Sequence, residues 1–139
     1  MSSVSDLLPK GKVYSIDADQ SVFEASQLMT DHSIGALPVL RGGELAGIFS
    51  ERDVVTRVVA QGRSPGMTKI SEVMTPNPRR VSTDESIENC VFIMSELGIR
   101  HLLVCEGQTL KGIISLRDVM FRELRSSPGA CEFRRKMSM

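Results

Sequence analysis

Apolar residues recur at helical spacing in two stretches of this sequence, residues 21–32 and 86–97. In each stretch they fall three and four positions apart, the spacing that lines one face of an α-helix. We therefore predict one helix from Ser21 to His32 and another from Ser86 to Leu97. Ser21 and Glu24 have the spacing of an N-terminal capping box, which supports the first of these starts.

Shorter apolar runs surround both helices and repeat the same order of elements. A short strand precedes each helix, and a hairpin of two strands and then a second helix follow it. Glycine in both hairpin turns supplies the positive φ that such turns need. The predicted ranges are strands at 13–16, 36–40 and 45–49 with a helix at 51–60, then a helical turn at 69–74, then strands at 80–82, 102–105 and 110–114 with a helix at 116–125.

The two halves are copies of one another. When the sequence is displaced by 65 positions, residues 16–55 align with 81–120 without a gap, and 14 of the 40 positions are identical. Unrelated segments would share roughly two or three. Three strands and two helices cannot bury both faces of their sheet alone. We predict an α+β fold of two βαββα repeats packed about a pseudo-two-fold axis, with a ligand bound between them.

The predicted domains follow from this duplication. The first repeat is placed at 4–62, a linker containing Ser, Pro and Gly at 63–67, the second repeat at 68–125, and a basic tail at 126–139.

Composition narrows the functional classes. Lysine plus arginine equals aspartate plus glutamate at 17 each, so no overall field draws the chain to nucleic acid or an anionic membrane. The three cysteines form no C-x-x-C pair, and their odd number suits a reducing compartment better than a secreted disulfide framework. Neither a signal peptide nor a membrane span is recognisable. We expect a cytoplasmic protein.

The most informative motif is Ser-x-Arg-Asp at the end of the last strand of each copy, residues 50–53 and 115–118. Serine followed three positions later by aspartate is a capping box, which alone has only a structural meaning. The same place also suits a ribonucleotide. The free N–H groups of a helix start, the serine hydroxyl and the arginine can bind phosphate, and the ionised aspartate can accept hydrogen bonds from two ribose hydroxyls.

These two motifs, with Ile34–Val39, Ile99–Val104 and Val73–Pro76, resemble the tandem cystathionine-β-synthase-type (CBS) domain pair, or Bateman module. The resemblance covers about residues 4–125. It implies βαββα repeats in pseudo-two-fold pairing and frequent dimerisation into a flat disc of four repeats. It also implies an adenosyl ligand such as AMP, ADP, ATP, NAD or S-adenosylmethionine.

In this family each site combines Ser-x-x-Asp of one copy with backbone on both sides of the first helix of the other copy. One implied ligand-binding site therefore joins Ser115, Arg117 and Asp118 to Tyr14, Ser15, Ile34, Gly35 and Ala36. The other joins Ser50, Arg52 and Asp53 to Arg79, Arg80, Ile99, Arg100 and His101. The second set has more positive charge for phosphates, and the first has an aromatic ring and small residues for adenosine. The copies also differ where Leu8-Pro9 stands in place of Met74-Thr75.

We expect a regulatory module and not an enzyme, because no nucleophile elbow, P-loop or dinucleotide fingerprint is present. His32 and His101 lack metal-ligand spacing, so no metal cofactor is predicted. The expected function is sensing of energy or redox state through an adenine nucleotide, by a homodimer that acts on an effector protein. A purely structural dimerisation scaffold with vestigial sites is the alternative. Nucleic-acid binding through Arg79, Arg80, Arg100 and the basic tail is a third and weaker hypothesis.

Overall fold

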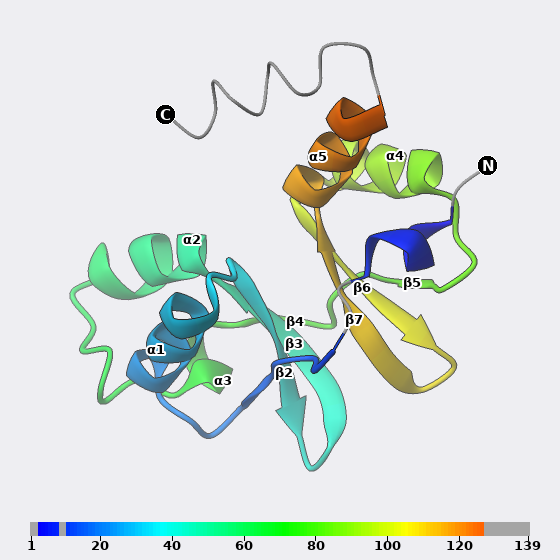
Figure 1. Cartoon of the computed structure of the whole chain (residues 1–139). Helices are drawn as coiled ribbons and strands as arrows, with labels where there is room; N and C mark the ends of the chain where they lie inside the picture. The colour runs from blue at the N-terminus through cyan, green and yellow to red at the C-terminus, as the bar shows by residue number, and fades with distance from the viewer. Residues whose placement is uncertain (1–2, 9–10, 127–139) are drawn as a thin grey trace. The chain divides into compact units, whose positions relative to one another are not determined.

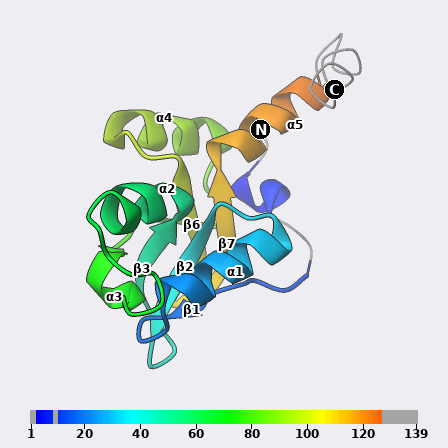
Figure 2. The ribbon, with the colours of Figure 1, turned by 90° about the vertical axis from the view of Figure 1, so that its left-hand side faces the viewer.

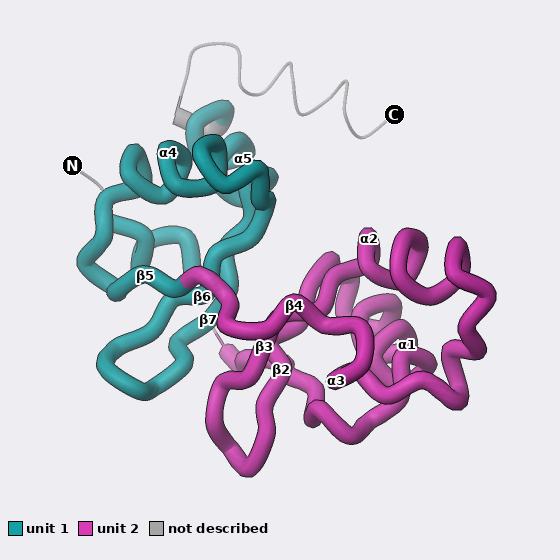
Figure 3. The backbone as a smooth tube through the Cα atoms, turned by 180° about the vertical axis from the view of Figure 1, so that it is seen from behind, with its two compact units in different colours: residues 1–10, 80–139 teal, residues 11–79 magenta. Residues whose placement is uncertain are grey.

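The computed structural model describes residues 3–8 and 11–126 of the 139-residue chain, so the predicted basic tail lies, apart from Ser126, outside the described residues. The chain forms two compact units (Figure 3). We call residues 11–79 the Asp53 unit and residues 1–10 with 80–139 the Asp118 unit, after the aspartate that each contains.

The Asp53 unit is built on a four-stranded sheet in the order β1-β2-β3-β4. Strand β1 runs parallel to β2, and the other neighbours are antiparallel. The elements are β1 (Ile16–Asp17), α1 (Val22–His32), β2 (Ala36–Arg41), β3 (Glu44–Ser50), α2 (Glu51–Asp53), the π-helix η2 (Val54–Val59), α3 (Ile70–Val73) and β4 (Thr75–Pro76). Helix α1 and the helix that begins at Glu51 cover this sheet (Figure 1, Figure 2).

The core of the Asp53 unit lies between these helices and the sheet. Val22, Ala25 and Met29 of α1 meet Leu37, Val39 and Phe49 of the hairpin and Ile70 of α3. The predicted start of α1 is confirmed, because the Ser21 side chain accepts from the amide of Glu24 and the Glu24 side chain accepts from the amide of Ser21.

The Asp118 unit repeats this plan with a three-stranded sheet in the order β5-β6-β7, in which β5 is parallel to β6. Its elements are the 3₁₀ helix η1 (Val4–Leu7), β5 (Arg80–Ser82), α4 (Ile87–Leu97), β6 (His101–Glu106), β7 (Thr109–Ser115) and α5 (Leu116–Ser126). Its core includes Cys90, Met94, Leu102, Val104 and Ile114. The duplication is visible in the backbone, because both hairpins have a register shift at equivalent positions, after Val39 and after Val104. The α+β fold of two such repeats is confirmed, and their pseudo-two-fold packing stays a prediction.

The structural units differ from the sequence repeats in their leading segments. Strand β4, which sequence analysis assigned to the second repeat, pairs with β3 of the Asp53 unit through Gly47↔Pro76 and Ile48↔Thr75. Helix η1, which was assigned to the first repeat, lies in the Asp118 unit, where Val4 is fully buried in the core. Each unit is thus completed by the segment that leads into the other repeat.

Close packing at two equivalent glycines fixes these leading segments. A Cβ on Gly47 would lie 2.6 Å from Sδ of Met74 and 2.7 Å from the backbone oxygen of Thr75. A Cβ on Gly112 would lie 2.8 Å from Cδ2 of Leu8. A side chain at Gly47 would collide with backbone, whereas at Gly112 only the end of the Leu8 side chain would have to shift.

Two predicted elements differ from the structure. The strand predicted at 13–16 is wrong for residues 13–15, because β1 pairs with β2 only at Ile16 and Asp17. The helix predicted at 51–60 is α-helical only over Glu51–Asp53 and continues as a π-helix. A run of β-branched residues crowds this segment, and the hydroxyl of Thr56 donates to the carbonyl of Arg52 at 3.0 Å, competing with the backbone.

Within the described part of the chain, none of the helices combines the length and the apolar character that crossing a bilayer demands.

Candidate functional site

The junction of β3 and α2 holds the first Ser-x-Arg-Asp motif. Ser50 is extended, with φ −123° and ψ 164°, and its hydroxyl oxygen accepts a hydrogen bond from the amide of Asp53 at 3.3 Å. In return Oδ2 of Asp53 accepts from the amide of Ser50 at 2.9 Å and from its hydroxyl at 3.1 Å. The predicted capping box is present, and it fixes the orientation of the Asp53 carboxylate.

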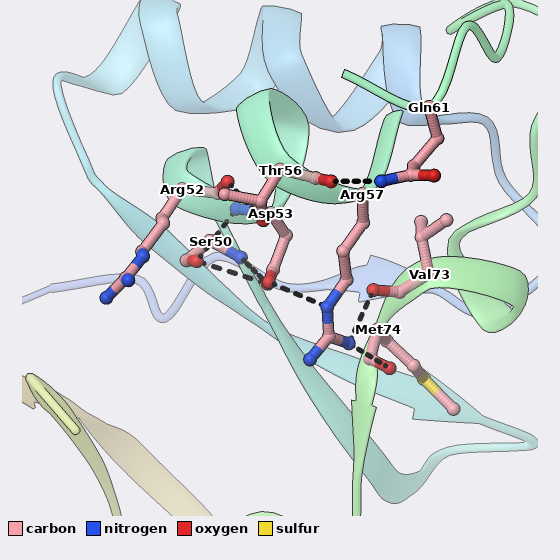
Figure 4. A network of polar contacts seen from close by, with 8 residues as sticks. All are labelled: Ser50, Arg52, Asp53, Thr56, Arg57, Gln61, Val73 and Met74. Carbon is pink, nitrogen blue, oxygen red and sulfur yellow. Dashed lines mark hydrogen bonds and ion pairs between the residues drawn. The ribbon is translucent and has the colours of Figure 1, made fainter. Parts of the chain in front are cut away.

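Arg57, one helical turn after Asp53, connects this carboxylate to the chain that enters the second repeat (Figure 4). Its Nε lies 3.5 Å from Oδ1 of Asp53. Its Nη1 donates to the backbone oxygens of Val73 and Met74, each at 3.1 Å. The Asp53 side chain is 14% exposed and that of Arg57 is 47% exposed, so the ion pair is only partly shielded from water. Arg57 was not among the predicted site residues, and its duplicate Arg122 follows just after the aligned region.

The junction of β7 and α5 repeats the capping box with fewer contacts. Oδ2 of Asp118 accepts from the amide of Ser115 at 2.8 Å, and the amide of Asp118 donates to the Ser115 hydroxyl oxygen at 3.0 Å. Within residues 3–8 and 11–126, Asp118 has no ion-pair partner. Nη2 of Arg122 lies 3.9 Å from Oδ2 of Asp6.

A depression of about 370 Å³ adjoins the exposed carboxylate of Asp118, lined by Asp6, Leu7, Leu8, Asp118 and Phe121. Three of these residues come from the leading segment at the N-terminus, and none of the three was a predicted site residue. The one feature of the sequence that pointed to this segment is that Leu8 corresponds to Met74 in the other copy.

The two motif arginines have different surroundings. The side chain of Arg52 is exposed and points away from the Arg57 network (Figure 4). The guanidinium of Arg117 lies 5.1 Å from the ring centroid of Phe121, a cation–π contact that the first copy cannot make because Thr56 stands at the equivalent position. Arg52 is therefore the more available of the two for a phosphate.

The helix starts offer fewer free amides than the sequence suggested. The amide of Glu51 donates to the carbonyl of Gly35 at 3.0 Å, and the amide of Leu116 donates to that of Arg100 at 2.9 Å. The amides of Asp53 and Asp118 are bonded to the capping serines. Two of the first three amides of each helix are thus already used, which leaves phosphate binding mainly to side chains.

The other predicted site residues divide between the units. Tyr14, Ser15, Ile34, Gly35, Ala36 and Arg79 lie in the Asp53 unit, and Arg80, Ile99, Arg100 and His101 lie in the Asp118 unit. Within each unit the hairpin register places Ala36 opposite Ser50 and His101 opposite Ser115. The predicted grouping of these residues with the aspartate of the other copy stays a prediction.

The side chain of Tyr14 already has an aromatic partner. Its ring stacks on His32 at a centroid distance of 3.8 Å with 21° between the planes, and Nζ of Lys12 lies 5.6 Å from its centroid. Tyr14 was predicted to contact adenosine, and no binding role was predicted for His32. The stack fixes the Tyr14 ring against the end of α1 and occupies one of its faces.

The remaining reactive groups in the described residues do not form a second site. Burial raises the pKa of the Cys90 thiol to about 11, so this cysteine is protonated at neutral pH. Among residues 3–8 and 11–126, no three His, Cys, Asp or Glu side chains gather as metal ligands would. Cys131 lies outside the described residues.

Comparisons with known proteins show the family of this chain. A family model for the CBS domain matches residues 4–60 and 70–124. The CBS domain-containing protein YhcV of Bacillus subtilis is 35% identical over 124 residues, which are 89% of this chain and 87% of that protein.

Solved structures show the same likeness. The CBS-domain containing protein ATU1752 from Agrobacterium tumefaciens is 36% identical, with a TM-score of 0.80 over 88% of this chain and 99% of that one. The CBS domain pair of protein MJ0100, solved in complex with 5′-methylthioadenosine and S-adenosyl-L-methionine, is 26% identical, with a TM-score of 0.77 over 86% of this chain and 93% of that one.

Proposed function

Because this chain belongs to the CBS domain family and carries two CBS domains, we propose that it is a regulatory module that binds an adenosyl ligand at Asp53 and Asp118. The observation that carries the proposal is an aspartate whose carboxylate accepts the same hydrogen bond from the serine amide in both copies. In both junctions the serine amide holds Oδ2 of the aspartate, at 2.9 Å and 2.8 Å. A carboxylate oriented in this way is suited to accept hydrogen bonds from ribose hydroxyls.

The chemistry of the ligand follows from what surrounds each carboxylate. Arg52, two positions after Ser50, is exposed and can neutralise a phosphate. The ligand class we propose is AMP, ADP, ATP, NAD or S-adenosylmethionine. The complex of the MJ0100 pair with two adenosyl compounds supports this class. We propose that the predicted residues of the other copy complete each site.

The regulatory output would pass to a separate protein in the cytoplasm, in response to energy or redox state. We also propose that the module is a homodimer. Val55 and Met120, which stand 65 positions apart on the second helices, are 61% and 55% exposed. Large apolar side chains exposed at equivalent places on both repeats favour burial against a second copy.

Thermal melting of the full chain with AMP, ADP, ATP, NAD and S-adenosylmethionine tests the proposal. A ligand at 100 times its Kd adds about 2.7 kcal/mol to the free energy of unfolding. For a chain of this size the Tm should rise by roughly 8–15 °C. Asp53→Ala and Asp118→Ala should each remove the part of the shift that belongs to their own site.

The same experiment distinguishes the scaffold alternative. The hydrogen bonds from Ser50 to Asp53 support that alternative, because a purely structural capping box would also have them. It predicts that no ligand shifts the Tm of the wild type. It also predicts that each aspartate variant has the same Tm with and without nucleotide.

A further inference from the structure

The two aspartates differ in how many hydrogen bonds they can still accept. A carboxylate has about four acceptor directions, two on each oxygen. At Asp53 both directions of Oδ2 are used, by the amide and the hydroxyl of Ser50. Oδ1 faces the guanidinium of Arg57 at 3.5 Å. Oδ2 of Asp53 is therefore saturated by the protein itself, and a new donor must approach Oδ1, beside Arg57.

The Asp118 carboxylate can still accept most of the hydrogen bonds that a carboxylate can take. Oδ2 accepts one hydrogen bond, from the amide of Ser115 at 2.8 Å. Within the described part of the chain the Asp118 side chain has no further partner, and the residue is exposed. The duplicate of Arg57 does not alter this, because Arg122 makes its ion pair with Asp6.

A ribose presents two neighbouring hydroxyls, and each donates one hydrogen bond. Asp118 can accept both without losing a contact. Asp53 can accept both only at Oδ1, where they compete with Arg57 for space, or at Oδ2 if the Ser50 hydroxyl gives way. Arg57 is the weaker of the two partners, because its contact is longer and its side chain is 47% exposed.

The same guanidinium holds the entry to the second repeat. Nη1 of Arg57 donates to Val73 and Met74, immediately before β4. Met74 in turn covers Gly47 on β3. A movement of Arg57 away from Asp53 therefore also disturbs the contacts that hold Val73 and Met74.

We propose that the two sites are unequal: Asp118 fills first, and Arg57 gates Asp53, so that only binding at Asp53 perturbs the Val73–Met74 segment. This inference rests on the proposed function. It makes the Asp53 site the regulatory one and the Asp118 site the constitutive one.

Adenosine is the probe of choice, because it carries the ribose hydroxyls without a phosphate that could itself attract Arg57. Its affinity is measured calorimetrically for the full chain with Asp53→Ala, which retains the Asp118 site, and with Asp118→Ala, which retains the Asp53 site. We expect the Asp118 site to bind adenosine about tenfold more tightly, the equivalent of one hydrogen bond to a charged group.

The gate itself is tested in the Asp118→Ala background. Arg57→Gln removes the cation but keeps an amide that can donate to Val73 or Met74, and it should tighten adenosine binding about two- to fivefold. Arg122→Gln, the duplicate position, is the matched control and should leave that affinity unchanged. Backbone amide NMR signals of Met74 and Thr75 should shift when adenosine saturates Asp118→Ala, but not when it saturates Asp53→Ala.

The outcomes separate the gate from the proposed function. Weaker or unchanged adenosine binding in Arg57→Gln, or Met74 and Thr75 signals that do not respond, overturns the gate while leaving ligand binding intact. If no adenosyl compound binds the wild-type chain, both proposals fall. Should Arg57→Gln not fold, Arg57→Lys, which keeps the charge but loses the forked guanidinium, is expected to tighten binding by about twofold, and no gain would overturn the gate.

Discussion

The Asp53 unit and the Asp118 unit carry the same motif after equivalent hairpins, yet they use equivalent arginines differently. Arg57 pairs with the aspartate of the motif and with two carbonyls of the leading segment. Arg122 pairs with Asp6 of the leading segment instead. The equivalent arginines thus pair with different carboxylates, one in the motif and one in a leading segment. Duplication preserved the parts of the site and changed their partners.

Shortening a core side chain in either unit should lower the free energy of unfolding more than any other change proposed here. Phe49 and Ile114 occupy equivalent positions and are both fully buried. We expect Phe49→Ala to lower the free energy of unfolding by about 3–5 kcal/mol and Ile114→Ala by about 2–5 kcal/mol, because each leaves a cavity. Urea denaturation measures both. Phe23→Ala, on a side chain that is 49% exposed, is the control and should cost less than about 1 kcal/mol.

The glycines beneath the leading segments should respond unequally to a methyl group. Gly47→Ala meets backbone at Thr75 and should cost about 1–3 kcal/mol. Gly112→Ala meets only the Leu8 side chain, which can move, and should cost about 1 kcal/mol or less.

Double variants sharpen this contrast. Leu8→Ala should relieve the clash in Gly112→Ala, whereas Met74→Ala should not relieve Gly47→Ala, because the Thr75 carbonyl stays in place. Full relief in both units would show that the two leading segments are held in the same way.

Removal of the capping serines should have a smaller effect, again unequal. Ser50→Ala loses the bond from the Asp53 amide and the bond to its carboxylate, whereas Ser115→Ala loses only the bond from the Asp118 amide. The loss of an N-cap costs about 1 kcal/mol. We expect Ser50→Ala to lower the free energy of unfolding more than Ser115→Ala does, as measured by denaturant unfolding. The reverse order would contradict the pattern of hydrogen bonds at the two serines.

Acid should weaken the Asp53 unit through two exposed glutamates. The amide of Lys69 and then the guanidinium of Arg63 lower the pKa of Glu72 below 4.5, and the side-chain amide of Gln20 does the same for Glu24. A folded-state pKa below the unfolded value contributes stability above pH 4.5, and this is lost as the pH falls through the folded pKa. The urea midpoints of the wild type and Glu72→Gln should therefore converge as the pH falls. The measurement extends to about pH 3, which lies below most carboxyl pKa values. A difference that stays constant over this range would contradict the prediction.

Much of this molecule could be predicted from short-range patterns. The starts of α1 and α4, both hairpins and both Ser-x-Arg-Asp capping boxes stand where the sequence indicated. Each depends on residues within about one turn of helix or one hairpin, so spacing and capping chemistry suffice. The π-helix after Asp53 was missed because periodicity does not distinguish i→i+5 from i→i+4 bonding over six residues.

The partners of the key side chains were decided only by tertiary structure. Arg57 meets Val73 from 16 positions away, and Arg122 meets Asp6 from the other end of the described chain. No local pattern shows that η1 packs with the second repeat or that β4 packs with the first, because both choices satisfy the same sequence periodicity. The sequence by itself determined the two aspartates and their caps. The path of the chain determined which aspartate is paired and which is open, since an ion pair depends on which segments the fold brings together.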